Sequence, residues 1–432
     1  ITETSRSTPV SGESDVLVCG AGPAGVAAAI AAARNGADTT LIELKGSLGG
    51  IWTSGLLSYV LDGGTNSRLF GELVGRLEGS AGKRLGSDHG PESPERELPW
   101  VATSFLYDTE IMKFVLERWC AELGIRLRFH TRVVDALCSA GIDAVITESK
   151  SGREAWTASV YVDATGDGDL SARADCRFDV GDPVHGRTQP MTLMALVGGI
   201  TFQDVAPFVA LHRRGNRPAK ELLRDQIRAG GFEPSYLMPS LFAVRDDLFA
   251  LMANHVYDES GTDADSVSRA TLSARSELFR VRDALRSSGP EWAGLRILQT
   301  AEHIGVREAR RVHGRYMVTK EDLIEGRRHE DGICHVTFPV DIHNERGYDT
   351  GGIRSKPYDI PIRALMANDR PNLLLAGRCI SGDHWAHASY RVTGDAVPMG
   401  EAAGTLAALA ATTGIPPDSV PWTRIRDALS RE

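Results

Sequence analysis

The chain has 432 residues, of which 42% are hydrophobic and 24% are charged, and its formal net charge is -9. This length favours two domains or one elaborated domain, and the composition is that of an ordinary globular protein. The acidic balance argues against nucleic acid as the main partner, because a phosphate-binding face needs an excess of basic residues. No apolar run approaches the roughly 20 residues that a membrane helix needs, so no membrane span is expected.

The six cysteines are scattered, and no two of them form a CxxC pair. This pattern predicts reduced thiols in a cytoplasmic protein, with neither a disulfide framework nor a metal site. The polar start of the chain, residues 1–14, lacks the apolar core of a signal peptide and is expected to be a loose tail. Because the chain begins with Ile, the sequence leaves open whether its natural start has been trimmed.

Residues 14–44 read "SDVLVCGAGPAGVAAAIAAARNGADTTLIEL" and predict a buried strand, an Ala-rich helix and a second strand ending at Glu43. Three glycines stand between the first strand and the helix at G-x-G-x-x-G spacing. We expect Gly20 to make a tight turn, Gly22 to let the backbone approach a pyrophosphate, and Gly25 to allow close helix–strand contact. The helix N-terminus would bind the phosphates, and Glu43 would accept hydrogen bonds from a ribose diol.

The next segment, "LKGSLGGIWTSGLL" (44–57), favours FAD over NAD as the nucleotide. Gly49 and Gly50 are expected against the pyrophosphate and ribityl chain, and Thr53 near the isoalloxazine. NAD enzymes of the simple Rossmann type usually carry a helix at this place instead. The segment after Leu44 contains no His or Cys that could attach a flavin, which predicts noncovalent FAD.

Later segments continue the same pattern. Residues 105–137 predict a helix capped by Asp108 or Thr109 and stopped at Gly124, followed by strands. Residues 159–174 predict a strand that runs into an Ala-Thr-Gly turn, where small residues permit a second close approach to the dinucleotide. The region between 180 and 355 alternates helix-like and strand-like stretches, which predicts a smaller sheet with covering helices that caps the flavin.

Taken together, these segments resemble the glutathione-reductase-type FAD superfamily and, within it, the group labelled FAD-dependent oxidoreductase. The resemblance covers most of residues 13–410. Its further matching stretches are "QPMTLM" (189–194), "IGVREARRVHG" (304–314), "DIPIRAL" (359–365) and "NLLLAGRCIS…HASYRV…MGEAAG" (372–404). It implies an α/β protein with a Rossmann-like FAD-binding domain in two pieces, 13–178 and 356–425. An α+β substrate or cap domain, 179–355, would be inserted between these pieces.

The resemblance also implies which residues bind the cofactor. Arg378 stands where relatives usually carry an acid that binds the ribityl or phosphate region, so its contact stays unassigned. Residues 397–404 are expected to begin a helix whose N-terminus lends positive potential to the flavin. The predicted cofactor-binding residues are Gly20, Gly22, Pro23, Ala24, Gly25, Glu43, Lys45, Gly49, Gly50, Thr53, Val134 (at the adenine), Ala164, Thr165, Gly166, Gly377, Arg378, Met399 and Gly400.

A polar stretch, "CISGDHWAHASYRVTGD" (379–395), lies between two apolar runs and is expected beside the isoalloxazine. His384 or His387 would be the base, since a histidine pKa lies near neutrality, and Arg391 would clamp an anion. Tyr390 is a weaker candidate, and in the alternative both histidines only brace the loop. Arg307 is predicted to clamp a carboxylate. Further candidates to face the substrate are Asn254, His255, His303, Asp341, His343 and Tyr358.

The function expected from these features is that of an FAD-dependent oxidase or dehydrogenase. It would remove a hydride from a small polar substrate and pass electrons to oxygen, a quinone or a protein acceptor. One alternative is a flavin-dependent monooxygenase that uses an external reductant, although the hydroxylase C-terminal pattern and the W-x-W-x-I-P signature of halogenases are missing. A further alternative is an electron-transfer flavoprotein subunit. The identity of the substrate and the oligomeric state stay open.

Overall fold

The computed structural model describes residues 1, 5–63, 67–80, 85–86, 104–210, 216–344 and 347–431. Its centre is a seven-stranded sheet in the order β6-β2-β1-β9-β8-β7, with β20 also pairing with β9. The strands are β1 (Val10–Cys19), β2 (Thr39–Ile42), β6 (Arg126–Arg128), β7 (Arg132–Cys138), β8 (Ile142–Ser149), β9 (Gly152–Asp163) and β20 (Leu373–Leu375). All neighbouring pairs are parallel except β7 with β8 and β8 with β9. This sheet confirms the predicted Rossmann-like α/β architecture.

Two helices rich in small residues, α1 (Pro23–Arg34) and α11 (Ala396–Thr413), pack against each other beside this sheet. Their contact is close because α11 presents glycines to the backbone of α1. A Cβ at Gly400 would lie 2.1 Å from the carbonyl oxygen of Ala24, and one at Gly404 would lie 2.0 Å from that of Ala28. Side chains of ordinary size would therefore hold the two helices apart.

The remaining helices of this part include α2 (Arg68–Gly79), α4 (Thr109–Glu122), α5 (Asp169–Arg173) and α12 (Trp422–Arg431). The α4 helix begins as predicted, because the Asp108 carboxylate accepts a hydrogen bond from the Glu110 N–H at 2.9 Å. The expected loose tail is wrong over residues 10–14. These residues belong to β1 and pair with β9, which satisfies their backbone groups.

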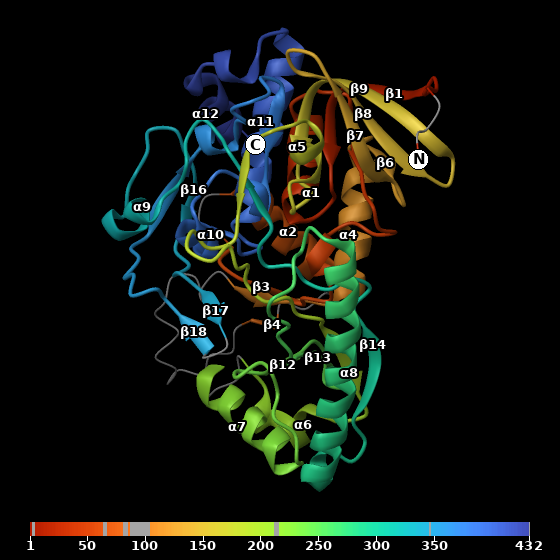
Figure 1. Cartoon of the computed structure of the whole chain (residues 1–432), viewed down its shortest axis with the longest axis vertical. Coiled ribbons are helices and arrows are strands. Elements are labelled where there is room, and N and C mark those ends of the chain that lie inside the picture. The colour runs from red at the N-terminus through yellow and green to blue at the C-terminus, as the bar shows by residue number, and fades with distance from the viewer. Residues whose placement is uncertain are drawn as a thin grey trace.

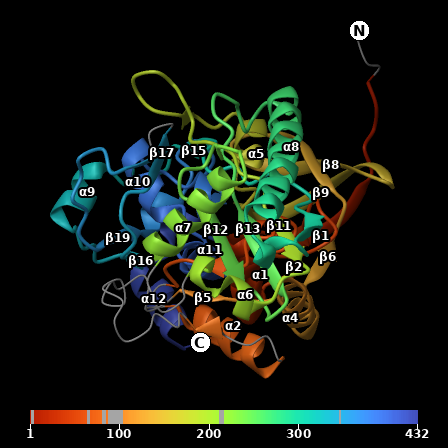
Figure 2. The same ribbon diagram turned by 90° about the horizontal axis from the view of Figure 1, so that it is seen from below.

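A second, antiparallel sheet forms the lower part of the molecule in Figure 1. Its order is β12 (Ser240–Ala243), β13 (Leu248–Met252), β11 (Ala195–Gly198) and β14 (Arg296–Thr300). The helices α6 (Phe202–Val205), α7 (Asn216–Ala229) and α8 (Ala264–Ser288) lie around this sheet, as the view from below shows (Figure 2). The smaller sheet with covering helices is therefore present where the sequence predicted it.

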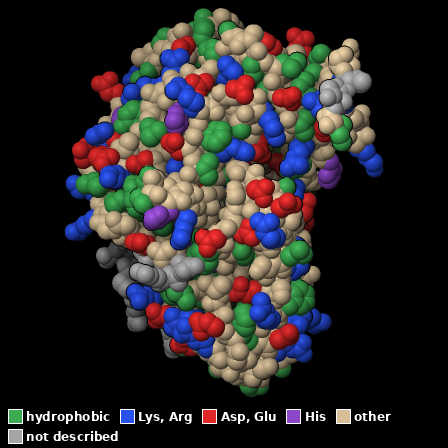
Figure 3. Space-filling view, in the orientation of Figure 1, with side chains coloured by type: hydrophobic (Ala, Val, Ile, Leu, Met, Phe, Trp, Pro, Cys, Tyr) green, Lys and Arg blue, Asp and Glu red, His purple; other side chains and the backbone are tan. Residues whose placement is uncertain are grey.

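This lower part has its own hydrophobic core, formed mainly between residues 191 and 304, whereas residues 312–367 contribute to the core of the first part. The predicted boundaries at 179 and 355 stay a prediction, and the separate core is narrower than they suggest. Charged side chains of both signs are interspersed over the face in Figure 3. In the described part of the chain, no helix combines the length and apolarity needed to cross a membrane.

Short elements complete the structure and connect the two parts. The short helices are α9 (Lys320–Glu325) and α10 (His384–Tyr390). The short strands are β3 (Tyr59–Val60), β4 (Leu85–Gly86), β5 (Phe105–Leu106), β10 (Phe178–Val180), β15 (Arg310–Val312), β16 (Gly332–Val336), β17 (Ile342–Asn344), β18 (Gly347–Asp349) and β19 (Tyr358–Pro361). They pair as β3-β5-β4, β10-β15, β16-β19 and β17-β18.

Candidate functional site

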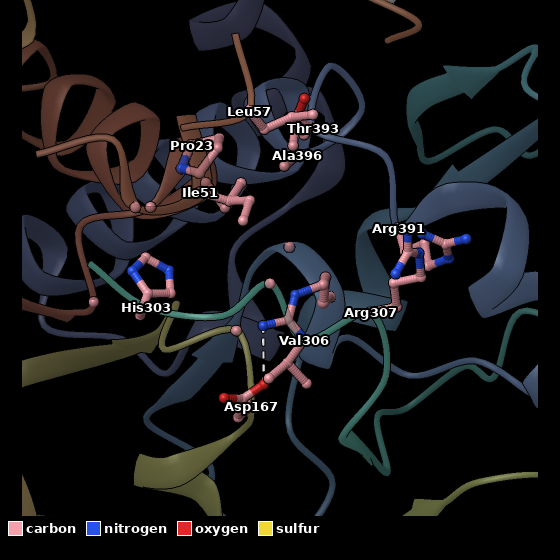
Figure 4. A pocket seen from close by; sticks show the side chains of 18 of the residues that line it. Pro23, Ile51, Leu57, Asp167, His303, Val306, Arg307, Arg391, Thr393 and Ala396 are labelled. Carbon is pink, nitrogen blue, oxygen red and sulfur yellow. Dashed lines mark hydrogen bonds and ion pairs between the residues drawn. The ribbon is translucent and has the colours of Figure 1, made fainter. Parts of the chain in front are cut away.

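A cavity of about 580 Å³ extends from the carboxyl ends of β1 and β2 to the second sheet. One end is lined by the glycine-rich turn, Glu43 and Val133, and the other by polar side chains that include Arg307 and Arg391. In Figure 4, Pro23, Ile51, Leu57, Thr393 and Ala396 lie on one side of this space, with Arg307 and Arg391 together at its edge. The position outside the carboxyl ends of parallel strands is where doubly wound sheets bind ligands.

The glycine-rich end fits the close approach of a dinucleotide. Gly20 has φ +92°, and a Cβ there would lie 2.5 Å from the carbonyl oxygen of Ala164. A Cβ at Gly25 would lie 1.8 Å from the carbonyl oxygen of Gly20, so α1 packs tightly on the turn. Gly22 instead faces open space, and Gly50 lies opposite it, with a built Cβ 3.0 Å from the Gly22 Cα. Two bare stretches of backbone thus flank the cavity, as an FAD pyrophosphate requires.

Glu43 is held in place at the end of β2. Its Oε2 accepts a hydrogen bond from the Ala21 N–H at 2.6 Å, and its Oε1 accepts one from the Lys45 N–H at 2.8 Å. Burial raises the pKa of Glu43, and these backbone donors oppose that effect. Each carboxylate oxygen retains a second lone pair, so a ribose hydroxyl facing the cavity can donate to it.

The adenosine end departs from the prediction by one residue. The cavity is lined there by Thr131, Arg132 and Val133, and its lining does not include Val134. The register between β7 and β8 shifts between Val133 and Asp135, which leaves Val134 at a bulge. A bulge redirects the side chains around it, and sequence spacing alone does not reveal one.

Arg378 forms an ion pair with Asp167 at 2.9 Å, and both residues line the cavity. Burial raises the pKa of Asp167, and the Arg378 charge opposes that rise. The Nη1 atom of Arg378 is buried and has no hydrogen-bond partner among the described residues. An acid is thus present at this place, but it comes from the turn after β9 and not from position 378. The unpartnered Nη1 is a donor that fits a phosphate or ribityl oxygen of FAD.

The structure brings most of the predicted cofactor-binding residues together, but six do not line the cavity. Thr53, for example, is buried and donates its hydroxyl to the Leu48 carbonyl at 2.5 Å. Gly400 faces the backbone of Ala24, as described above. Besides Val134, the predicted residues that do not line the cavity are Gly25, Gly49, Thr53, Met399 and Gly400. Those that line it are Gly20, Gly22, Pro23, Ala24, Glu43, Lys45, Gly50, Ala164, Thr165, Gly166, Gly377 and Arg378.

At the opposite end, Asp341 joins Arg391 and His343. Arg391 Nη2 donates to Asp341 Oδ2 at 3.1 Å and to the Asp341 carbonyl at 2.8 Å. His343 Nε2 lies 3.1 Å from the same Oδ2. Burial opposes ionisation of Asp341, but His343 and Arg391 hold its pKa below the ordinary value. An ionised carboxylate only accepts hydrogen bonds, so His343 carries its proton on Nε2.

This tautomer leaves the Nδ1 lone pair of His343 free. No described residue bonds to Nδ1, and this atom is not sealed away from solvent, in contrast to Nδ1 of His303 and His387. Burial lowers the pKa of His343 and outweighs the opposing effect of Asp341, so the ring is neutral near pH 7. His343 lines the cavity. A neutral imidazole with a free nitrogen and a carboxylate behind it is the arrangement of a proton acceptor.

His255 has a different environment from His343. Its Nε2 lies 3.0 Å from Arg307 Nη2, which can only donate, so the His255 proton resides on Nδ1. That nitrogen lies 3.2 Å from the Tyr257 hydroxyl, which donates to the Asn344 carbonyl at 3.0 Å. Burial and the Arg307 charge lower the pKa of His255. Both nitrogens are therefore used, and His255 orients Arg307.

Of the predicted catalytic residues, Arg307 and Arg391 line the cavity, whereas His384, His387 and Tyr390 do not. Residues 384–390 form the helix α10, which turns these side chains into the core, whereas Arg391, directly after it, reaches the cavity. His384 Nδ1 lies 3.1 Å from Glu308 Oε1, and the Tyr390 hydroxyl donates to the Ile380 carbonyl at 3.2 Å. Burial lowers the pKa of His387. These contacts fit the bracing role better than catalysis.

The other candidates to face the substrate divide in the same way. His303 lines the cavity, and burial lowers its pKa to about 4. Asn254 pairs with the backbone of Leu193, and the Tyr358 hydroxyl donates to Ser389 at 3.1 Å, so both are structural. Asp341 and His343 were predicted to face the substrate, but no chemical role was predicted for either of them. Their spacing of two residues, which places both side chains on one side of an extended segment, was the available signal.

Comparisons with known proteins agree with this geometry. The family model for FAD dependent oxidoreductase matches residues 15–429. A solved flavin-dependent brominase is 12% identical, with a TM-score of 0.50, over 97% of this chain and 83% of that chain. Anhydrotetracycline hydroxylase from Streptomyces rimosus is 14% identical, with a TM-score of 0.47, over 97% of this chain and 65% of that chain.

L-proline dehydrogenase from P. horikoshii is 13% identical, with a TM-score of 0.44, over 94% of this chain and 95% of that chain. At such identities the likeness extends to the fold alone, and this chain spans only about two thirds of the hydroxylase. No curated protein sequence matches the chain. The family match, however, covers nearly the whole length and agrees with the dinucleotide cradle. The chain therefore belongs to the FAD dependent oxidoreductase family and is a flavoprotein enzyme with FAD as its cofactor.

Proposed function

We propose that the protein removes a hydride from a small polar substrate, with His343 taking the accompanying proton. FAD, when bound, supplies the redox chemistry by accepting the hydride. The observation that carries the proposal is the Asp341–His343 pair at the cavity end away from the dinucleotide cradle. An oxidation that converts a C–H and a neighbouring O–H or N–H bond into a double bond needs such an acceptor.

His343 is suited to this step by its protonation state and by its support. The neutral ring offers Nδ1 to a substrate O–H or N–H, while Asp341 fixes the tautomer and the ring orientation. Once His343 accepts a proton, the adjacent Asp341 carboxylate stabilises the positive charge that forms. Tyr236 stacks on His255 with a ring-centroid distance of 4.0 Å and lies edge-on to His343 at 5.9 Å, which restricts ring motion.

We infer that the electrons then pass to oxygen, a quinone or a protein acceptor. A second G-x-G-x-x-G that could form a separate NAD(P)H domain is missing from the sequence. This favours substrate oxidation over a monooxygenase reaction that draws its electrons from NAD(P)H.

The proposal is tested by adding candidate donors to the FAD-loaded protein without oxygen and recording loss of flavin absorbance. We expect at least one small polar donor to bleach the flavin. His343→Gln should slow bleaching by about 10²–10⁴-fold while FAD stays bound, as for loss of a general base. His185→Gln, at an exposed position, is the matched control. Bleaching by NAD(P)H alone, with oxygen incorporated into a product, would instead assign the monooxygenase alternative.

A further inference from the structure

The arginines beside His343 indicate the chemical class of the substrate. We propose that the substrate is a 2-hydroxy or 2-amino carboxylic acid with an apolar side chain, its carboxylate bound between Arg307 and Arg391. We call the cavity end lined by Arg307, Arg391, Asp341 and His343 the chamber. The anion site rests on the geometry of this chamber alone. The position of the oxidised carbon rests on the proposed function, in which His343 takes the proton.

Arg307 is a partly buried cation without a carboxylate partner among the described residues. Its Nη1 donates to the Pro190 carbonyl at 2.8 Å and to Thr192 Oγ1 at 2.7 Å, and its Nη2 bonds to His255. Within the described residues, no Asp or Glu lies within ion-pair distance of it. Burial and the Arg391 charge lower its pKa to about 10, which still leaves it charged at neutral pH. A buried charge of this kind is stabilised by an anion.

Arg391 adds a second cation. Its counter-ion is Asp341, which also bonds to His343. The Arg391 side chain is 10% exposed, and its Nη2 bonds to Asp341 and to Gln189 Oε1 at 3.3 Å. Its Nε is buried and has no partner in the described part of the chain. Asp341 offsets one of the two arginine charges, whereas His255 and His343 are neutral. The five groups together carry a positive charge that a monocarboxylate would balance.

The shared oxygen of Asp341 sets the distance between the anion site and the proton acceptor. Arg391 and His343 both bond to Asp341 Oδ2, so these two side chains are neighbours. A carboxylate at the arginines would therefore lie close to the His343 ring, and the adjacent carbon, with its hydroxyl or amino group, is the one that we assign to oxidation. A substrate whose oxidisable group lay several carbons from its carboxylate would not meet both groups.

The wall next to this chamber is apolar, which suits the side chain of the substrate. Tyr59 and Phe242 stack with ring centroids 5.5 Å apart. The apolar and aromatic side chains that line this wall are Leu57, Tyr59, Met194, Phe242 and Met252. An apolar substituent that packs against these side chains is removed from water. This burial stabilises the complex by roughly 25 cal/mol per Å² of apolar surface.

The reaction balances as a two-electron oxidation. The C–H bond next to the carboxylate breaks, and its electron pair leaves with the hydrogen to FAD. The O–H or N–H bond breaks, and its proton goes to His343 Nδ1. The remaining electron pair forms a C=O or C=N bond, so that the product is a 2-oxo or 2-imino acid. The proton and electrons then leave the site before the next turnover.

The anion site is tested with benzoate as the probe and benzamide as its uncharged counterpart. Both are added to FAD-loaded protein, and binding is followed by the change in the flavin absorption spectrum, which requires no turnover. We expect saturable binding of benzoate that is at least tenfold tighter than that of benzamide. Arg307→Met and Arg391→Met should each weaken benzoate binding by about 10- to 100-fold, because a charge-assisted hydrogen bond is lost. Arg217→Met, at an exposed position, should leave binding unchanged.

Arg307→Lys provides the check against misfolding, because it keeps the charge and should bind benzoate more tightly than Arg307→Met. Equal binding of benzoate and benzamide, or of wild type and Arg307→Met, would overturn the anion site. Tighter binding of inorganic phosphate than of any carboxylate would also overturn it.

A donor screen separates the substrate class from the proposed function. We expect 2-hydroxy or 2-amino acids with apolar side chains to bleach the flavin without oxygen, and their esters to react at least tenfold more slowly. If benzoate binds as expected but only donors without a carboxylate bleach the flavin, the substrate class is wrong and the proposed function stands. If benzoate binds but no donor of any class bleaches the flavin, the proposed function fails while the anion site stands.

Discussion

Replacing Gly404 by alanine tests the contact between α1 and α11 that places the end of the cavity. A Cβ at Gly404 would lie 2.0 Å from the Ala28 carbonyl oxygen and 2.7 Å from its carbonyl carbon. These are backbone atoms, so no rotamer change can relieve the clash and α11 has to move away from α1. Overpacking of this kind typically costs about 1–3 kcal/mol, and the short distance places this substitution at the upper end. Alanine recovers about 1 kcal/mol of helix propensity.

The net expectation is a loss of about 2 kcal/mol in the free energy of unfolding for Gly404→Ala. Gly71→Ala is the matched control, because Gly71 lies exposed in the helix α2 and a Cβ there would meet nothing within 4 Å. That variant gains the same propensity without the clash, so its free energy of unfolding should rise by about 0.5–1 kcal/mol. The same chemical change therefore has opposite signs at the two sites.

Urea unfolding of the FAD-loaded proteins, followed by flavin fluorescence and by circular dichroism, measures both changes. Gly404→Ala should also weaken FAD binding, because movement of α11 shifts Ala396, which lines the cavity at the start of this helix. If Gly404→Ala is as stable as the wild type, or if both variants are stabilised, the packing argument is refuted.

Three further expectations follow from the same contacts. Asp341→Asn should keep FAD but reduce the steady-state turnover number by about 10²-fold or more, because His343 loses the carboxylate that fixes its tautomer. Since burial lowers the pKa of His343 below its ordinary 6.5, stopped-flow flavin reduction should stay constant near neutrality and slow only below about pH 6.5, where protonation removes the base. Five of the six cysteines are buried, so a thiol reagent should titrate chiefly Cys138 in the native protein and all six thiols in denaturant.

The dinucleotide cradle was predictable from the sequence because its geometry is local. Gly20, Gly22 and Gly25 act within one strand–turn–helix unit, and each has the surroundings that its spacing implies. Glu43 follows from the same unit, since the end of the neighbouring strand lies beside the turn. Val134 marks the limit of this reasoning, because a bulge shifts the strand by one residue without any sequence sign.

The substrate end was less predictable because it depends on contacts between distant segments. The polar stretch 379–395 was assigned to the cavity as a whole, but its middle forms a helix that buries His384 and His387. The part of the stretch that faces the cavity begins directly after that helix, at Arg391, and helix ends are uncertain in any sequence-based reading. The partner of Arg391, Asp341, lies on another segment, and nothing local in either stretch predicts that pairing.

The buried histidine His384 still bears on the chamber, although it lies outside the cavity. His384 and Arg311 both bond to Glu308 Oε1, and Glu308 Oε2 accepts a hydrogen bond from the Gln189 N–H at 3.2 Å. The Gln189 side chain in turn accepts hydrogen bonds from the Arg391 guanidinium and from the backbone N–H of His343, both at 3.3 Å. A continuous set of polar contacts therefore runs from α10 to the two groups that we assign to anion binding and proton transfer.

Such a network explains why so many polar side chains lie between two apolar segments. Buried polar groups are costly unless they find partners, and here His384 finds one in Glu308 and Arg391 finds two in Asp341 and Gln189. Gln189 holds Arg391 and the backbone of His343 through one oxygen, so the relative position of the two follows from a side chain that does not itself line the cavity. The polar stretch thus contributes one charged group to the cavity, Arg391, with Val392 and Thr393 beside it, and the support that orients this arginine.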